Sequence, residues 1–313
     1  MHRPKHIIEY VFVRMFAAVF QFLPHRVGLS IGFILAGISH YLLRFRVREA
    51  RSRIRDVFGD DLSERDVRRI AWLSWRNICF SVVEILSMPR LTAARAQHRM
   101  VDIDATGPYL GDEAARNGLV LAVPHSGNWD FAGVACHLQG YPMFFIARRQ
   151  RNVLVDNYLN RMRGASGAET VHNDAHLLRS VIKGLRGGKI LGILPDVRAR
   201  TPALAITFLG GHANIGAGMA MFARQVNCAI QPAGVFRVGW TRHQWQMCDA
   251  VFPDESLDKQ EDWKRMTQAV MTSLDQFIRE HPEHYFWYNK RWVLDPLTDT
   301  EGASMALEKN AEF

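Results

Sequence analysis

The stretch Leu119-Val-Leu-Ala-Val-Pro-His-Ser-Gly-Asn-Trp-Asp130 decides the expected fold. Residues 119–123 are apolar and mostly branched, which is typical of a buried β-strand. Pro124 has no N–H group to donate to a neighbouring strand, so the strand ends there and His125 follows at its carboxyl end. Ligand clefts in open α/β sheets form at this end of the strands. The stretch therefore predicts an α/β fold with a functional site around His125.

Turn-forming residues at 126–128 allow the chain to reverse into a helix expected at residues 129–139. On one straight helix His125 and Asp130 would point roughly 140° apart, so they can meet only if Gly127 bends the chain between them. A carboxylate on one ring nitrogen holds a histidine in one tautomer and stabilises its cation, which suits a general base. A strand-end histidine bonded to a helix-capping aspartate has the same spacing, so both interpretations stay open at this point.

Strand and helix patterns alternate in the chain that follows. Residues 143–147 and 190–194 have the pattern of strands, and residues 152–163 and 173–186 have that of helices. Asp196 comes after the second of these strands, so an acidic residue again stands at a strand's carboxyl end. Alternation of this kind predicts a mostly parallel central sheet flanked by helices.

Residues 230–236 and 244–252 are expected strands, and apolar residues at intervals of three and four predict an amphipathic helix over 263–277. The aromatic segment 282–288 is suited to packing beneath the site. Upstream, residues 62–87 have a helical pattern that begins with a capping box. Glu84 lies on this helix among apolar neighbours, either as a buried carboxylate facing the site or, the favoured interpretation, at its rim.

The first sixty residues are expected to associate with a membrane. Residues 7–23 form an apolar, amphipathic segment, and residues 27–43 carry no formal charge over seventeen positions, the lower limit for a bilayer span. Six arginines follow at residues 44–55, placed to meet phospholipid headgroups. The prediction is an anchor of one short span or two interfacial helices, with a buried helical hairpin as the alternative. The expected domains are 1–60 (membrane-anchoring helices and basic segment), 61–296 (α/β domain) and 297–313 (polar tail).

The composition is that of a folded protein with an anionic partner. Of the 313 residues, 48% are hydrophobic and 11% aromatic, which excludes a disordered chain. The net charge of +8 fits an anionic lipid, an acidic carrier protein or nucleic acid. The four cysteines, Cys79, Cys136, Cys228 and Cys248, have no metal-ligand spacing and are expected to be reduced thiols. The sequence leaves the oligomeric state open.

Four motifs carry a resemblance to a known family. They are His125-Ser-Gly-Asn-Trp-Asp130, Ile193-Leu-Pro-Asp196, the glycine-rich segment 207–218 and the aromatic segment 281–292. The first resembles the His-x4-Asp motif of the glycerolipid acyltransferases. As a set, the four are similar to the lipid A late acyltransferase family of lauroyl and myristoyl transferases, which includes the phosphatidylinositol mannoside acyltransferases. The resemblance extends over residues 11–296.

The resemblance implies an acyltransferase in which His125, oriented by Asp130, takes the proton of an acceptor hydroxyl that attacks an acyl thioester. Asp196 would help to hold the histidine or to orient the acceptor. The implied co-substrate is an acyl carrier protein or acyl-CoA thioester, with no bound cofactor, no metal and no nucleic-acid partner. The implied acceptor is a glycolipid of the lipid A precursor type. Such an enzyme works on membrane lipids at the bacterial inner membrane, with its active site on the cytoplasmic side.

The resemblance also suggests residues that bind the substrates. In the family an arginine after the 143–147 strand lines the cleft, so Arg149 would bind a phosphate of the donor or the acceptor. A solvated surface arginine is an equal alternative. The glycines of segment 210–218 precede an expected apolar helix, where main-chain N–H groups can face an anion or an oxyanion. The candidates are Asn128, Arg149, Asn152, Asp156, Gly211 and Asn214.

Departures from the family pattern bear on the acceptor. Val197 follows Asp196 where many members have glutamine, and Asn214 stands where threonine is common. The Glu-Gly-Thr-Arg motif of phospholipid-type acyltransferases is absent, which points away from lysophosphatidic acid. Three alternatives remain: a phospholipid or other glycolipid acyltransferase, a membrane-bound thioesterase or lipid hydrolase that activates water with the same residues, and a non-enzymatic membrane adaptor.

Overall fold

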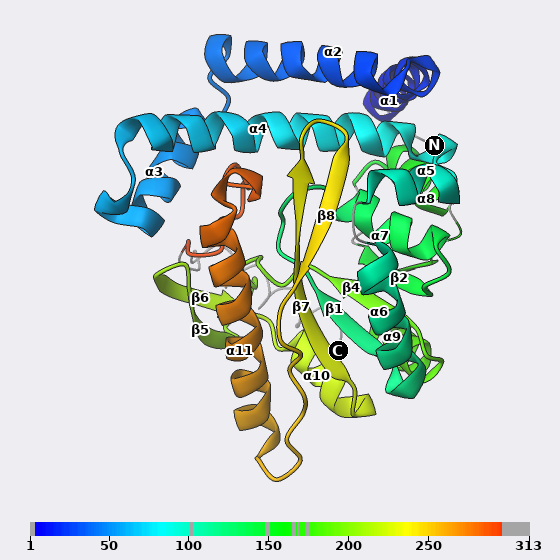
Figure 1. Ribbon diagram of the computed structural model, residues 1–313, viewed down its shortest axis with the longest axis vertical. Helices are drawn as coiled ribbons and strands as arrows, with labels where there is room; N and C mark the ends of the chain where they lie inside the picture. Colours follow the sequence, from blue (N-terminus) through cyan, green and yellow to red (C-terminus); the bar gives the residue numbers. More distant parts are fainter. Residues whose placement is uncertain are drawn as a thin grey trace.

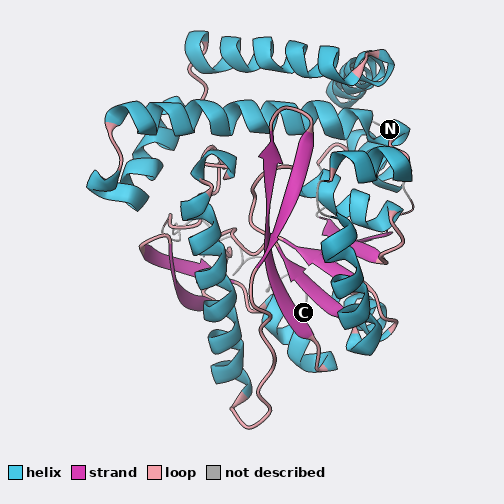
Figure 2. Cartoon of the chain, in the orientation of Figure 1, coloured by secondary structure: helices cyan, strands magenta, loops and turns pink. Residues whose placement is uncertain are grey.

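A computed structural model describes residues 4–100, 103–147, 151–164, 167, 169–172 and 176–295. Their central sheet has the strand order β3-β2-β4-β1-β7-β8 (Figures 1 and 2). Its strands are β1 (Leu119–Ala122), β2 (Met143–Ala147), β3 (Glu169–His172), β4 (Ile190–Ile193), β7 (Ala229–Val238) and β8 (Arg242–Met247). All neighbours pair in parallel except β7 and β8, which are antiparallel. The predicted mostly parallel sheet flanked by helices is confirmed.

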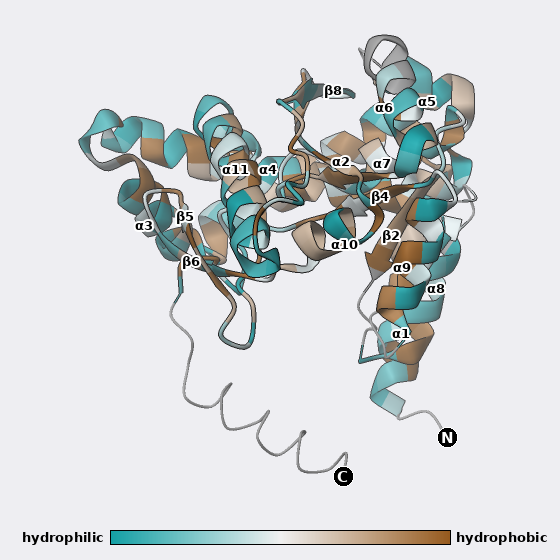
Figure 3. Ribbon diagram, turned by 90° about the horizontal axis from the view of Figure 1, so that it is seen from below, coloured by the Kyte–Doolittle hydropathy of each residue, from teal (hydrophilic) through white to brown (hydrophobic). Residues whose placement is uncertain are grey.

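Helices cover both faces of the sheet and make a three-layer fold. One face packs against α5 (Ala93–Arg99), α6 (Ile103–Asn117) and α7 (Trp129–Leu138). The other packs against α9 (Leu177–Arg186), α10 (Gly218–Val226) and α11 (Lys259–Glu280), while α8 (Val153–Gly164) contacts the edge strand β3. All four residues of β1 are buried because it lies between two helical layers. Figure 3 shows β2 as a hydrophobic strand beside helices α8 and α9 of mixed polarity.

Four further helices lie at the carboxyl end of the sheet (Figure 1). They are α1 (Pro4–Phe22), α2 (His25–Gly37, followed by a π-helical turn at Ile38–Leu42), α3 (Val47–Phe58, followed by a 3-10 turn at Gly59–Asp61) and α4 (Glu64–Ser87, followed by a 3-10 turn at Met88–Arg90). The Ser63 hydroxyl caps α4 by accepting a hydrogen bond from the Asp66 N–H at 3.2 Å. Helix α2 packs closely on α4 because Gly32 has no side chain. A Cβ at this position would lie 3.0 Å from the Val83 side chain.

Most of the large apolar side chains that stay exposed belong to the helices before residue 46. Ile8 and Phe22 of α1 are 69% and 77% exposed, and Leu42 is 76% exposed. Among the described residues, no single helix is both long and apolar enough to cross a bilayer. Residues 25–42 and 47–61 meet both criteria only when taken together, as a pair bent by 85°.

Several expectations from the sequence are corrected by the fold. Arg53, expected at the headgroups, is buried and donates to the carbonyl oxygens of Trp287 and Asn289 at 2.8 and 2.7 Å. The glycine-rich segment before the expected apolar helix forms a hairpin of β5 (Leu204–Phe208) and β6 (Gly211–Ile215), which the sequence did not predict. The four cysteines are free thiols, as predicted.

Candidate active site

The register of β1 and β4 brings His125 and Asp196 together. Ala122 lies opposite Ile193 in the parallel pair, and each of the two polar residues stands three positions further along its strand. The Nδ1 atom of His125 lies 2.7 Å from Oδ1 of Asp196, and the main-chain N–H of His125 donates to Oδ2 at 2.9 Å. One carboxylate therefore holds both the ring and the backbone of the histidine.

The turn after His125 is fixed by contacts that require a glycine. Gly127 has a φ of +59°, and a Cβ at this position would collide with the carbonyl oxygen of Val235 in β7. The fully buried Ser126 donates to that same carbonyl at 2.9 Å, and Ser81 of α4 donates to the carbonyl of Gly127 at 3.1 Å. The turn is thus clamped between the sheet and α4, so the imidazole is held in one place.

The aromatic segment near the carboxyl terminus packs against this turn, as predicted. The N–H of Phe286 donates to the carbonyl of His125 at 2.9 Å, after a 3-10 turn at Pro282–His284. Tyr285 is buried beside Asp196; burial, together with the charge of that carboxylate, raises the pKa of the Tyr285 hydroxyl well above its ordinary value. Sequence reasoning missed this role, because one tyrosine among several aromatics carries no signal of its partner.

The electrostatic environment of His125 suits a general base. Burial of the ring lowers its pKa, but the charge and hydrogen bond of Asp196 raise it more, so that the pKa of His125 lies above its ordinary value of 6.5. Since Nδ1 donates to Asp196, Nε2 carries the lone pair that can accept a proton. The His125 side chain keeps 18% of its surface exposed. The Trp129 ring lies edge to face against the imidazole, with 5.0 Å between the two ring centres.

The structure corrects the expected partner of the histidine ring. The hydrogen bond to Nδ1, assigned from the sequence to Asp130, is made by Asp196. Asp130 lies partly exposed in the first turn of α7, and its charge makes a smaller contribution to raising the pKa of His125. Of the predicted trio, Asp196 thus holds the histidine, which is one of the two roles expected of it, and Asp130 acts on the ring through its charge.

Asn128 and Glu84 belong to a buried network behind the site. The Asn128 side chain caps α7 by accepting from the N–H of Phe131 at 3.1 Å and donates to Glu84 at 2.7 Å. Glu84 also receives two hydrogen bonds from Arg237, at 2.9 and 2.7 Å, and lies 3.2 Å from the ring of His243. Asn128 is 1% exposed and Glu84 2%, so the expected rim position of Glu84 is wrong, while the substrate contact expected of Asn128 stays a prediction.

The sequence pattern of the bacterial lipid A biosynthesis acyltransferases matches residues 2–293. This chain belongs to that family. A histidine held by a carboxylate at the carboxyl end of the sheet, as His125 is by Asp196, can accept a proton from a hydroxyl, which is the chemistry that an acyl transfer to an alcohol needs.

The acyltransferase is also similar to curated relatives at low identity. It shares 25% identity over 227 residues with a phosphatidylinositol mannoside acyltransferase from Mycolicibacterium smegmatis, covering 71% of each chain. A phosphatidylinositol mannoside acyltransferase from Mycobacterium tuberculosis is 22% identical over 61% of this chain and 60% of its own. A lipid A biosynthesis acyltransferase from Haemophilus influenzae is 23% identical over a region that covers 56% of this chain and 54% of its own. The matches thus cover less than two thirds of the last two relatives.

Two predicted substrate contacts of the acyltransferase lie on α8 or just before it. The buried Asn152 donates to the carbonyl of His6 and to the carboxylate of Glu9, both at 2.9 Å, so it ties α8 to α1 instead of facing a cleft. Asp156, one turn further on, accepts a 3.4 Å hydrogen bond from Asn160. Arg149 lies outside the described residues. The substrate-binding roles of Asn152 and Asp156 stay predictions.

Gly211 and Asn214 of the acyltransferase lie in β6 and not in a loop before a helix. The Asn214 side chain donates to the carbonyl of Thr201 at 2.7 Å and accepts from the N–H of Ala203 at 2.7 Å. It therefore shapes the loop that follows Asp196. A Cβ at Gly211 would lie 3.0 Å from the Leu294 side chain, so this glycine allows close packing. Their substrate-binding role stays a prediction.

The acyltransferase should gain activity as the pH rises through the pKa of His125, because only the neutral ring can accept a proton. Since this pKa lies above 6.5, the midpoint of the acid limb of kcat/KM should lie above pH 6.5. Asp130→Asn removes a charge that raises the pKa, so the midpoint should move to lower pH. Initial rates over a pH series measure both effects, and a midpoint unmoved by Asp130→Asn would contradict the assignment.

Proposed function

We propose that this acyltransferase moves a fatty acyl group from an acyl thioester to a hydroxyl of a membrane glycolipid, with a lipid A precursor as the favoured acceptor. The observation that supports it best is the 2.7 Å contact of His125 Nδ1 with Asp196, which directs Nε2 to act as the base. The donor is an acyl carrier protein or acyl-CoA. The mannoside relatives make a phosphatidylinositol mannoside the second candidate acceptor.

The reaction follows from this geometry. Nε2 of His125 takes the proton of the acceptor hydroxyl as its oxygen attacks the carbonyl carbon of the thioester. A new C–O bond forms, and the carbonyl becomes a tetrahedral oxyanion. When the oxyanion collapses, the C–S bond breaks and the imidazolium returns the proton to the thiolate. Asp196 stabilises the imidazolium between the two proton transfers, so the enzyme forms no covalent acyl intermediate in this scheme.

The exposed apolar helices supply access to a lipid acceptor. They lie at the carboxyl end of the sheet, the end that carries His125 (Figure 1). Apolar side chains on an interfacial helix bury themselves between the headgroups and the acyl chains, which would hold the site at the level of a lipid hydroxyl. We therefore place the enzyme on the cytoplasmic face of the bacterial inner membrane, anchored by α1 and α2 as an interfacial pair.

The purified enzyme should add one acyl mass to its acceptor, as measured by mass spectrometry. Each donor is offered with a lipid A precursor, with a phosphatidylinositol mannoside, and without acceptor, and His125→Ala is the matched control. Acylation of the lipid A precursor supports the favoured acceptor, and acylation of the mannoside alone supports the second. Loss of the thioester without any acceptor would show a thioesterase. A His125→Ala gene that fully restores the lipids of a deletion strain would contradict an enzymatic role.

A further inference from the structure

A basic cavity lies below the turn between α1 and α2. It has a volume of about 320 Å³ and is bounded by that turn, the end of α4, the 3-10 turn after it, and α5. Its eleven lining residues include His25, Arg90, Arg95 and Arg99 and contain no aspartate or glutamate. Three guanidinium groups and an imidazole therefore surround one space that has no acidic group on its wall.

The imidazole in this cavity leaves hydrogen-bonding capacity unused. Nε2 of His25 is buried and has no hydrogen-bond partner among the described residues, since the nearest carboxylate oxygen of Glu84 is 3.7 Å away. Glu84 is itself engaged by Arg237. Burial lowers the pKa of Arg99, and the charge of Arg95 lowers it further, although Glu84 opposes them. Holding like charges together at a partly buried site costs free energy unless a bound anion neutralises them.

The rim of the cavity is apolar on the side of the membrane-facing helices. Phe22, which is 77% exposed, forms part of the wall, and the Arg90 guanidinium lies 4.9 Å from the centre of its ring. Leu23 and Pro24 continue this wall. A ligand that fits has a negative group for the arginines and an apolar part for the adjoining surface. An arginine fork is well matched to phosphate oxygens.

We propose that this cavity binds the phosphate of an anionic membrane lipid and so docks the α1–α2 turn on the bilayer. The site is separate from His125 and goes beyond the proposed acyl transfer. It also differs from the exposed arginines that follow α2, because it is a walled cavity with a fixed set of donors. A lipid held there would fix the height and orientation of α4, whose last residue, Ser87, forms part of the wall.

Binding of the full-length protein to vesicles tests the proposal. The vesicles contain either phosphatidylcholine alone or phosphatidylcholine with phosphatidylglycerol, and co-sedimentation gives the ratio of the two affinities. Each basic residue near an anionic bilayer contributes about fivefold, so Arg95→Gln with Arg99→Gln should reduce the preference for phosphatidylglycerol about 25-fold. Arg95→Gln alone, at an exposed position, should reduce it about fivefold and guards against misfolding of the double variant.

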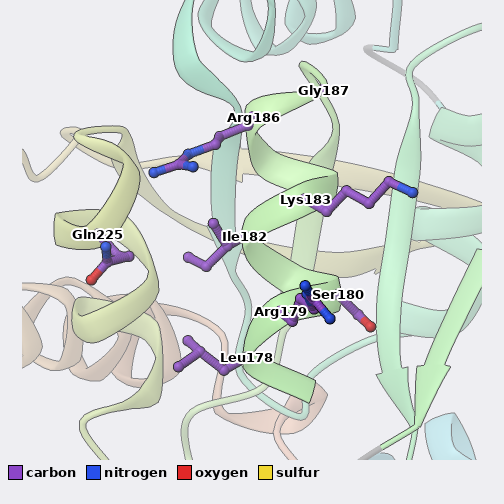
Figure 4. A pocket seen from close by; sticks show the side chains of 8 residues that line it. All are labelled: Leu178, Arg179, Ser180, Ile182, Lys183, Arg186, Gly187 and Gln225. Atoms are coloured by element: carbon purple, nitrogen blue, oxygen red, sulfur yellow. The ribbon is translucent and has the colours of Figure 1, made fainter. Parts of the chain in front are cut away.

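Two further variants separate the cavity from general charge. Arg179→Gln with Arg186→Gln removes the same two charges from α9, where they line another cavity together with Lys183 (Figure 4). Figure 1 shows α9 far from α1 and α2, so this pair should keep the preference within about twofold. Leu91→Trp keeps every charge but fills the cavity, and it should lose most of the preference.

The outcomes decide between the sources of the preference. Equal losses from the α9 pair and the cavity pair, or an unchanged preference in Leu91→Trp, would overturn the proposal. Calorimetry with inorganic phosphate alone distinguishes the lipid from a free ion, because tight binding of phosphate without vesicles would assign the cavity to a soluble anion. His125→Ala should bind vesicles as the wild type does, so a failure of the proposed acyl transfer would leave this result unaffected.

Discussion

Replacing Asp196 with asparagine is expected to lower kcat for acyl transfer by about 10³- to 10⁴-fold while the fold stays intact. The amide keeps the shape of the carboxylate and can still accept from the main-chain N–H of His125. It has no negative charge to stabilise the imidazolium, and an NH2 group facing Nδ1 selects the tautomer with its proton on Nε2. In that tautomer Nε2 has no free lone pair, so it cannot accept the proton of the acceptor.

Variants of the neighbouring residues serve as controls for this result. His125→Ala removes the base itself and should cost about 10²- to 10⁴-fold. Asp130→Asn removes a charge but no hydrogen bond to the ring, so its effect should stay below about tenfold, the equivalent of one pKa unit. Single-turnover rates with one acceptor lipid compare the three variants. A larger loss from Asp130→Asn than from Asp196→Asn would restore the assignment made from the sequence.

The sequence could predict the strands of the site but not their register. The apolar runs before His125 and Asp196 are local signals, and both residues were correctly expected at the carboxyl ends of parallel strands. Which carboxylate reaches the ring depends on the pairing of β1 with β4, strands separated by about seventy residues. The sequence favours Asp130 as the partner of the ring because it lies only five residues from His125, and the sequence gives separations along the chain but not distances in space.

The roles of single polar residues are harder to predict from sequence than the apolar runs. Asn152 and Asn214 were predicted to bind substrate, yet their side chains bind main-chain groups of other segments. An asparagine that satisfies a buried carbonyl and one that binds a ligand have the same sequence signal. The β5–β6 hairpin was missed for a related reason, because its glycines indicate a turn equally well before a helix or a strand.

Glu84 shows a second limit of local patterns. A carboxylate among apolar neighbours on a helix must either reach solvent or find a buried partner, and the helix alone cannot reveal the partner. Arg237 and His243 come from β7 and β8, about 150 residues away in the chain, and both are buried with it. This network joins α4 to the hairpin of β7 and β8 and to the cap of α7, so its integrity bears on the geometry around His125.

Replacing Glu84 with alanine should therefore destabilise the protein by about 3–5 kcal/mol, because Arg237 would stay buried without its counter-charge. The two side chains are no more than 1% exposed, so water cannot replace the lost partner. For a chain of this length the change corresponds to a fall in Tm of roughly 5 °C or more. Thermal unfolding in detergent, followed by circular dichroism, measures it.

A double variant separates the unpaired charge from the loss of packing. Glu84→Leu with Arg237→Met removes both charges and should recover most of the stability that Glu84→Ala loses. The pH dependence gives a second comparison: burial raises the pKa of Glu84, but Arg237 and His243 lower it well below 4.5. The stabilisation is therefore present above pH 4.5 and is lost as the pH falls through the depressed value, so Tm should fall more steeply in acid for the wild type than for the double variant. Equal losses of stability in Glu84→Ala and the double variant would instead attribute the effect to packing.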